Sequence, residues 1–385
     1  MKLFGPQIGR AHLHGPASAE PAKEHSNNCF DVLRFIAALF VLLSHSFALV
    51  GMPEPHLLGM TVGTMGVNVF FVTSGYLIFQ SWQRDPSIPR YLARRTLRIF
   101  PALLAAVLVT VFIIGPAMSS LPVGTYLQRR ETYRYLGNIA FIGSKTLPGV
   151  FESNPYPDTV NGGLWTLKYE FAMYLILLGI GVLGRKAKWV LPCGLVLVAL
   201  CSAVLASCLR LAQFGLDAAI PFATHVAETV ESRFSSTSLR FPELALYFMI
   251  GALFSHWRER VSFRWDVFLG MMLAWYFVSD QVGSFALAWL IVSYGALCFG
   301  TSNVSGLSRF GRRGDFSYGI YIYGFVVQQC VSKLLGPAPS WGIALMLSFA
   351  VTLVMGVLSW RFIEAPAMRF KDDLCARLPG GLKWT

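Results

Sequence analysis

Charged side chains are scarce in this chain of 385 residues. Asp, Glu, Lys and Arg together make up 14% of the residues, whereas hydrophobic residues make up 55%, and the mean hydropathy is +0.54. This composition excludes a soluble enzyme, because soluble domains carry roughly 25% charged residues. We therefore predict an all-α fold, a polytopic membrane bundle surrounded by bilayer lipid.

Several motifs are also missing. The seven cysteines include no pair with metal-ligand spacing, so we interpret them as small core residues and predict no metal. Long repeats of the kind that many secondary transporters carry are absent. Residues 1–29 have no apolar core or cleavage site, which predicts a soluble cytoplasmic tail and not a signal peptide.

Basic residues exceed acidic residues by twelve. They gather in short segments between apolar runs, a pattern typical of membrane topology signals, so we do not expect nucleic acid as a partner. Most of these segments fall on one side of the predicted bundle, which places both termini in the cytoplasm. The transmembrane part is predicted to span residues 30–370, followed by a second cytoplasmic tail at 371–385.

Ten apolar runs are long enough to be read as transmembrane helices. They cover residues 32–52, 62–82, 97–118, 164–184, 189–209, 241–257, 265–281, 284–300, 316–335 and 341–361.

The first run lies within FDVLRFIAALFVLLSHSFALVG, and its residues 32–52 contain two ionisable side chains, Arg34 and His45. Their separation corresponds to about three whole helical turns and roughly 16 Å along the axis, so they share one stripe, with His45 near mid-depth. Ionisable groups at such depth normally face a polar cavity. We expect both residues to open into one passage; the alternative for His45 is a hydrogen bond to a neighbouring helix.

A cluster of arginines precedes and enters the third run. The cluster consists of Arg90, Arg94, Arg95 and Arg98; Arg94 and Arg98 are one helical turn apart and share a face, and Arg95 also approaches Arg98 at a spacing of three residues. A guanidinium group can bind phosphate oxygens through two parallel N–H···O hydrogen bonds, so a cluster of arginines suits a multiply phosphorylated ligand. Such a cluster is also typical of a positive-inside anchor, but its position on the same side as Arg34 favours the functional interpretation.

The segment LWTLKYEF contains Glu170, a carboxylate inside a predicted span. It is our candidate catalytic partner, either orienting His45 or holding the hydroxyl groups of an acceptor. Lys168 is an alternative partner that would neutralise it. Trp165 and Tyr169 are typical interface residues and are also candidate platforms for a sugar.

Taken together, these motifs resemble the membrane-bound acyltransferase 3 family. The resemblance rests on Arg34 and His45 with ten residues between them, on GVNVFFVTSGYLI, on RRTLR and on LWTLKYEF. It implies a ten-helix enzyme of the bacterial inner membrane that transfers an acyl group, usually acetyl, from cytoplasmic acetyl-CoA to a sugar hydroxyl of an exported or surface polysaccharide or glycolipid.

The resemblance also implies residue roles. His45 would be the catalytic histidine, and Arg34, Arg95 and Arg98, joined by Arg94 of the same cluster, would bind the CoA donor. A neutral imidazole suits proton removal from a hydroxyl near pH 7, although His45 could instead attack first and carry the acyl group. Where many relatives have a second histidine, this chain has Gly324, so no proton transfer is assigned there.

Two other classes of function stay open at this point. A transporter or flippase of a lipid-linked sugar could use His45 and Glu170 as a proton relay. A binding component of a polysaccharide assembly machinery would need neither residue. The arginine cluster on the side of Arg34 favours the enzyme.

Overall fold

The computed structural model describes residues 28–157, 159–185, 189–213, 240–278, 281–336 and 340–379. The predicted N-terminal tail therefore lies almost entirely outside the described residues. The first half of the chain contains α1 (Phe30–Ala48), β1 (His56–Leu57), β2 (Met60–Thr61), α2 (Val62–Arg84), α3 (Ile88–Val109), α4 (Gly115–Met118), α5 (Val123–Gln128), α6 (Arg130–Arg134) and α7 (Leu167–Leu183). The second half contains α8 (Val190–Gln213), α10 (Phe241–His256), α11 (Trp265–Phe277), α12 (Gln281–Thr301), α13 (Ser317–Leu335), α14 (Trp341–Ser359) and α15 (Ala365–Arg377).

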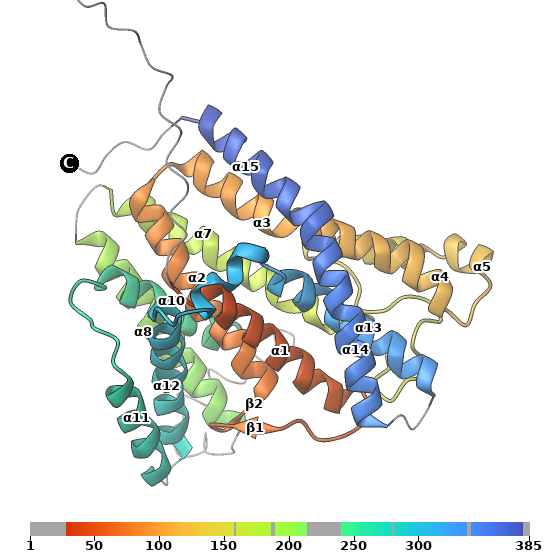
Figure 1. Ribbon diagram of the computed structural model, residues 1–385, viewed down its shortest axis with the longest axis horizontal. Coiled ribbons are helices and arrows are strands. Elements are labelled where there is room, and N and C mark those ends of the chain that lie inside the picture. The colour runs from red at the N-terminus through yellow and green to blue at the C-terminus, as the bar shows by residue number, and fades with distance from the viewer. Residues whose placement is uncertain are drawn as a thin grey trace, which may run out of the picture.

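Short 3-10 and π-helical pieces join some of these helices. They are η1 (Thr110–Ile114), η2 (Tyr135–Ala140), η3 (Gly162–Thr166), η6 (Leu307–Arg313) and η7 (Trp360–Glu364). The π-helical pieces η1 and η7 extend α3 into α4 and α14 into α15 without a break in the helical path. Figure 1 shows α15 lying along α3, and the two helices are in contact.

The all-α prediction is confirmed, since the described sheet is one two-stranded hairpin of β1 and β2. Each of the ten predicted runs coincides with a helix. By length and composition, seven helical stretches of the described residues can cross a membrane. They are Phe30–Ala48, Val62–Arg84, Ile88–Met118, Gly162–Leu183, Val190–Leu211, Gly283–Thr301 and Trp341–Arg377. The number of ten spans and the cytoplasmic termini stay predictions.

Three of the helices that coincide with predicted runs do not meet the length and composition required of a membrane span, two because they are short and one because it carries polar residues. Helix α10 has 16 residues and α11 has 13. Helix α13 is as long as α1 but carries Gln328, Gln329 and Lys333. Its polar side chains are used inside the bundle: Gln328 donates to the backbone carbonyl oxygen of Leu42 and Gln329 to those of Tyr156 and Thr159. A central helix can therefore be polar because its neighbours satisfy its hydrogen bonds.

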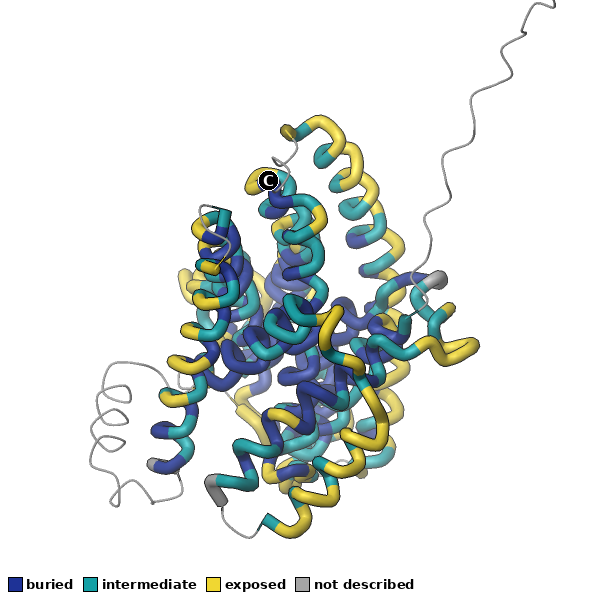
Figure 2. The backbone as a smooth tube through the Cα atoms, turned by 90° about the vertical axis from the view of Figure 1, so that its left-hand side faces the viewer, coloured by how far each residue is buried: buried dark blue, intermediate teal, exposed yellow. Residues whose placement is uncertain are grey.

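Apolar side chains also cover the outside of the bundle. Helix α11 has no buried residue, and Leu269, Leu273 and Phe277 are each more than 60% exposed. Figure 2 shows buried segments gathered in the interior and exposed segments on the outer helices. Large exposed apolar surfaces are typical of a face that contacts lipid.

Helices α2 and α10 make the closest crossing. A Cβ atom added at Gly75 would lie 1.9 Å from the carbonyl oxygen of Phe248, and one added at Gly251 would lie 2.1 Å from that of Val72. Two glycines thus let the backbones touch, as small residues do in membrane helix pairs. This crossing holds the central helix α2 in place.

We predict that Gly75→Val prevents stable packing, because a side chain cannot fit against backbone atoms. Overpacking typically costs about 1–3 kcal/mol. Here the obstructing atoms belong to the backbone of Phe248, so no side-chain rotation can make room. The measurement is the thermal unfolding midpoint of the purified protein in detergent. Gly179→Ala in α7 is the matched control, because nothing lies within 4 Å of its added Cβ, and an equal loss in both variants would contradict the prediction.

Candidate active site

Two cavities lie inside the bundle. We call the first the arginine cavity, since it is lined by Arg34 of α1 and by Arg94, Arg95 and Arg98 of α3. We call the second the histidine cavity, since it is lined by His45 of α1 and by Trp165 and Lys168. Counting the open solvent at their mouths, they enclose about 960 and 1900 Å³.

Helix α1 contributes to both cavities, with Arg34 in its second turn and His45 in its last turn. The helix stops at Ala48, before Gly51 with its φ of +77° and Pro53. The first apolar run was expected to stay helical to residue 52, so the helix ends four residues early, whereas the depth of His45 in the bilayer stays a prediction. The expected common passage is also not found: the two residues line different cavities, whose shared wall includes Val67 and Tyr321.

Asp315 binds two of the cavity arginines. Its carboxylate accepts a hydrogen bond from the guanidinium of Arg98 and lies 3.3 Å from that of Arg34. It also accepts from the hydroxyl of Ser317 at the start of α13. Burial opposes ionisation of Asp315, but Arg98, Arg34 and these hydrogen bonds outweigh it and hold the pKa of the carboxyl well below its usual range.

Arg98 and Arg94 have further carboxylate partners. Arg98 lies 3.8 Å from the buried Glu364 of η7, whose other oxygen accepts from Ser359. Arg94 donates to Asp85, the residue that ends α2. These pairs fix the arginines in position and neutralise part of their charge.

Arg95 differs from the other arginines of the cavity, because no carboxylate among the described residues pairs with it. Its Nε atom, like that of Arg34, is buried without a hydrogen-bond partner among the described residues, and its guanidinium carbon lies 5.9 Å from the centre of the Tyr174 ring. The Tyr174 hydroxyl donates to Glu170, which also accepts from Ser74 at 3.2 Å. Arg95 is thus held against a ring, with donor capacity left for a ligand.

Glu170 lines the arginine cavity, not the histidine cavity. The predicted contact between Glu170 and His45 is therefore not present. The helix that carries Glu170 turns its carboxylate toward Ser74 on α2, where Tyr174 one turn further along satisfies it. The spacing of residues in the sequence does not predict this rotation of α7 about its axis.

The ring of His45 packs edge-on against Phe325 of α13, with 5.0 Å between the ring centres. Within the described part of the chain, no hydrogen bond occupies a ring nitrogen of His45, so both are available to a ligand or to water. Glu54, in the loop after α1, lines the same cavity and accepts from Ser44, the neighbour of His45.

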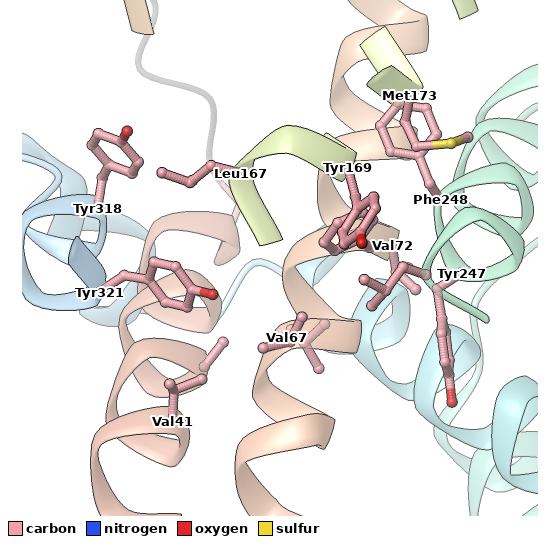
Figure 3. Close-up of a cluster of buried hydrophobic side chains, with 14 of the residues drawn as sticks. Val41, Val67, Val72, Leu167, Tyr169, Met173, Tyr247, Phe248, Tyr318 and Tyr321 are labelled. Atoms are coloured by element: carbon pink, nitrogen blue, oxygen red, sulfur yellow. The ribbon is translucent and has the colours of Figure 1, made fainter. Parts of the chain in front are cut away.

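The predicted sugar platform is only partly present. Trp165 lines the histidine cavity, but Tyr169 does not: it is buried and stacks on Phe241 at 5.2 Å. Figure 3 shows Tyr169 among the core side chains near Val72. Lys168 takes its place in the cavity wall, with its ammonium 4.7 Å from the Tyr169 ring. The residue before Tyr169 faces the cavity because α7 is rotated relative to the expected orientation.

The comparisons with known proteins decide the family. The acyltransferase domain profile of the acyltransferase 3 family matches residues 27–360. The chain belongs to this family. Family membership, together with the several apolar helices of the chain, supports a multi-pass membrane O-acyltransferase.

Two curated relatives align with nearly the whole of this acyltransferase. One is the "O-acetyl transferase" of Shigella phage Sf6, 31% identical, with 88% of this chain and 96% of the relative covered. The other is "Nodulation protein 10" of Rhizobium leguminosarum bv. viciae, 26% identical, with 93% and 98% covered. No solved structure gives a significant match.

Sequence reasoning missed several residues that line the two cavities or bind their arginines. Asp315 is an acidic residue directly after the basic segment SRFGRRG, and that contrast was the available signal. Lys371 and Met368 of α15 line the arginine cavity, although residue 371 was expected to begin a cytoplasmic tail. Gly324 lines neither cavity and faces Leu42 of α1. Among the described side chains, no cluster of His, Cys, Asp and Glu is suited to a metal ion.

We predict that Asp315→Asn destabilises this acyltransferase by about 3 kcal/mol at pH 7, because two arginines lose their carboxylate. A carboxyl whose folded-state pKa is lowered contributes stability above its unfolded pKa of about 4, and this contribution is lost as the pH falls through the lower folded value. The gap between the two proteins in chemical denaturation should therefore be full at pH 7 and smaller below pH 4.

The control is Asp266→Asn, which removes one partner of the exposed Arg264–Asp266 pair. Exposed pairs contribute little, so this variant should unfold like the unmodified protein. An Asp315→Asn variant with the same small effect at every pH would contradict the assigned ion pairs.

Proposed function

We propose that this protein transfers an acyl group, most often acetyl, from acyl-CoA on the cytoplasmic side to a sugar hydroxyl on the outer side of a bacterial inner membrane. The observation that carries the proposal is the adjacency of the two cavities, one rich in arginine and one containing His45, with Val67 and Tyr321 in both walls. A donor and an acceptor entering from opposite sides would meet at this wall.

The arginine cavity suits a phosphorylated donor. Arg34, Arg94 and Arg98 already have carboxylate partners, so they shape the cavity and offer only their remaining N–H groups. Arg95 lines the same cavity without a carboxylate partner among the described residues, so its guanidinium is the best placed to bind phosphate oxygens directly. Lys371 adds a further cation to the wall. Acetyl-CoA, with its several phosphates and long thioester arm, fits these requirements.

The chemistry requires a base at the acceptor hydroxyl. His45 would accept the hydroxyl proton while the oxygen attacks the thioester carbonyl, and the proton would then pass to the departing sulfur. Both ring nitrogens are unoccupied by described residues, which suits this role. The route in which His45 first carries the acyl group uses the same atoms.

The histidine cavity suits a carbohydrate. Its wall combines the rings of Trp165, Tyr156 and Phe325 with the side chains of Asn138 and Asn161. Aromatic faces and amide groups together recognise sugars through stacking and hydrogen bonds. An exported polysaccharide or a glycolipid is therefore the proposed acceptor, and assembly machinery for such a glycan is a proposed partner.

The transporter alternative needs His45 and Glu170 in one proton path. They line different cavities, and Glu170 is bound to Ser74 and Tyr174. This arrangement favours transfer chemistry over a relay.

We predict that His45→Gln lowers acyl transfer by about 10²–10⁴-fold, because glutamine keeps polarity but cannot act as the base. The measurement is thiol release from acetyl-CoA by the purified protein with candidate glycans, together with mass analysis of the acetylated product. The unfolding midpoint of the variant checks its fold. Full activity in a folded His45→Gln protein would contradict the proposed role.

We predict that Arg95→Ala raises KM for acetyl-CoA about 10–100-fold, since charge-assisted hydrogen bonds contribute about 1.5–3 kcal/mol. KM for the glycan should stay unchanged. Arg264→Ala is the matched control, because Arg264 is exposed and lines neither cavity. A selective rise in the glycan KM of Arg95→Ala would place the donor elsewhere.

A further inference from the structure

The wall between the two cavities is built from α2 and α13. Within the described residues, Val67 of α2 and Tyr321 of α13 line both cavities. Figure 3 shows the Tyr321 ring reaching from α13 toward α2, where Val67 lies. In this state the wall stands between the arginines and His45, whereas transfer needs the thioester carbon within bonding reach of a hydroxyl next to His45.

Tyr321 is the part of this wall that can move alone. Its hydroxyl shares one hydrogen bond of 2.6 Å with Thr166 of η3, and its ring packs edge-on against Phe70 at 5.5 Å. Rotation about the side-chain bonds of Tyr321 would break this hydrogen bond without moving the backbone. Val67 is β-branched and short, so its side chain has little freedom to clear a path.

The contacts of Tyr321 lie along the line from Arg34 to His45. The Arg34 guanidinium is 6.0 Å from the centre of the Phe70 ring, and Phe70 contacts Tyr321. One turn further along α13, Phe325 contacts His45. Because Tyr321 lines both cavities, removing its ring would take away part of the wall between them.

Thr166 ties the wall to both cavities. Thr166 itself lines the arginine cavity, whereas its neighbour Trp165 lines the histidine cavity. A ligand that shifts Trp165 would therefore strain the bond from Thr166 to Tyr321. The position of this bond links occupancy of the histidine cavity with opening of the wall.

We propose that Tyr321 is a gate between the donor and acceptor cavities, closed by its hydrogen bond to Thr166 and opened for transfer. This inference rests on the proposed function. With the gate open and an acceptor present, a new C–O bond forms to the sugar, the C–S bond breaks, and the hydroxyl proton passes through His45 to the thiol. Without an acceptor, water would replace the sugar and yield a free carboxylic acid and the thiol, so the closed gate prevents waste of the donor.

The first test compares thioester hydrolysis without acceptor with acyl transfer. Tyr321→Phe removes only the hydroxyl, and Tyr321→Ala also removes the ring. We expect the ratio of hydrolysis to transfer to rise about fivefold in Tyr321→Phe, the change that corresponds to one ordinary hydrogen bond, and further in Tyr321→Ala. The matched control is Tyr323→Phe, a buried tyrosine of α13 that lines neither cavity. An unchanged ratio in both Tyr321 variants would overturn the gate.

The second test does not depend on catalysis. His45→Cys is combined with either Tyr321 or Tyr321→Ala in membrane vesicles of known orientation, and an anionic, membrane-impermeant methanethiosulfonate reagent is added to the cytoplasmic face. Mass spectrometry of the peptide containing position 45 separates its labelling from that of the native cysteines. We expect strong labelling only with Tyr321→Ala.

Equal labelling with and without the Tyr321 ring would overturn the gate, whether or not the protein transfers acyl groups. If the unmodified protein releases no thiol with any glycan, while labelling of position 45 in the His45→Cys protein still depends on Tyr321, the proposed function is contradicted and the gate stays in place.

Discussion

The structure depends on placing arginines inside an apolar bundle, which is costly unless carboxylates offset much of their charge. Asp315 does this for Arg34 and Arg98 and thereby joins α1, α3 and the start of α13. These segments are far apart in the sequence, and both of the arginines that Asp315 binds line the arginine cavity. A pairing that the bilayer makes obligatory thus also organises a ligand site.

Under the proposed function, the two cavities would divide the work that acyl transfer across a membrane demands. A charged nucleotide and a bulky glycan would not share one apolar interior, but each would occupy an aqueous cavity on its own side. Helix α1 contributes Arg34 to one cavity and His45 to the other, while α13 contributes Tyr321 to both. The transfer itself would then require movement of an acyl group past a thin wall, and not of either large substrate across the membrane.

The sequence predicted the helices well and their rotations poorly. Long apolar runs specify helices because the bilayer demands them, so all ten ranges coincide with helices. Glu170 and Tyr169 were assigned to the wrong surroundings, since the rotation of α7 depends on packing against α2 and α10 and not on local pattern. Asp315 was missed because its partners lie far away in the chain. Arg34 and His45 could be singled out because a polar group in an apolar run is visible without a structure, and Arg95 because it belongs to a cluster of arginines that resembles a family motif.

Helix α15 continues α14 through η7 without a break. It places Met368 and Lys371 in the wall of the arginine cavity, which Arg34 also lines. Its far end is fastened to α3, where Arg90 donates to the carbonyl oxygen of Leu378 and Ser87 to that of Pro379. During biosynthesis, therefore, this cavity cannot be complete until the ribosome has made α15 and this helix has docked against α3. Before that point the arginines would have no enclosed site for the proposed donor, so competence to bind it would depend on the docking of α15.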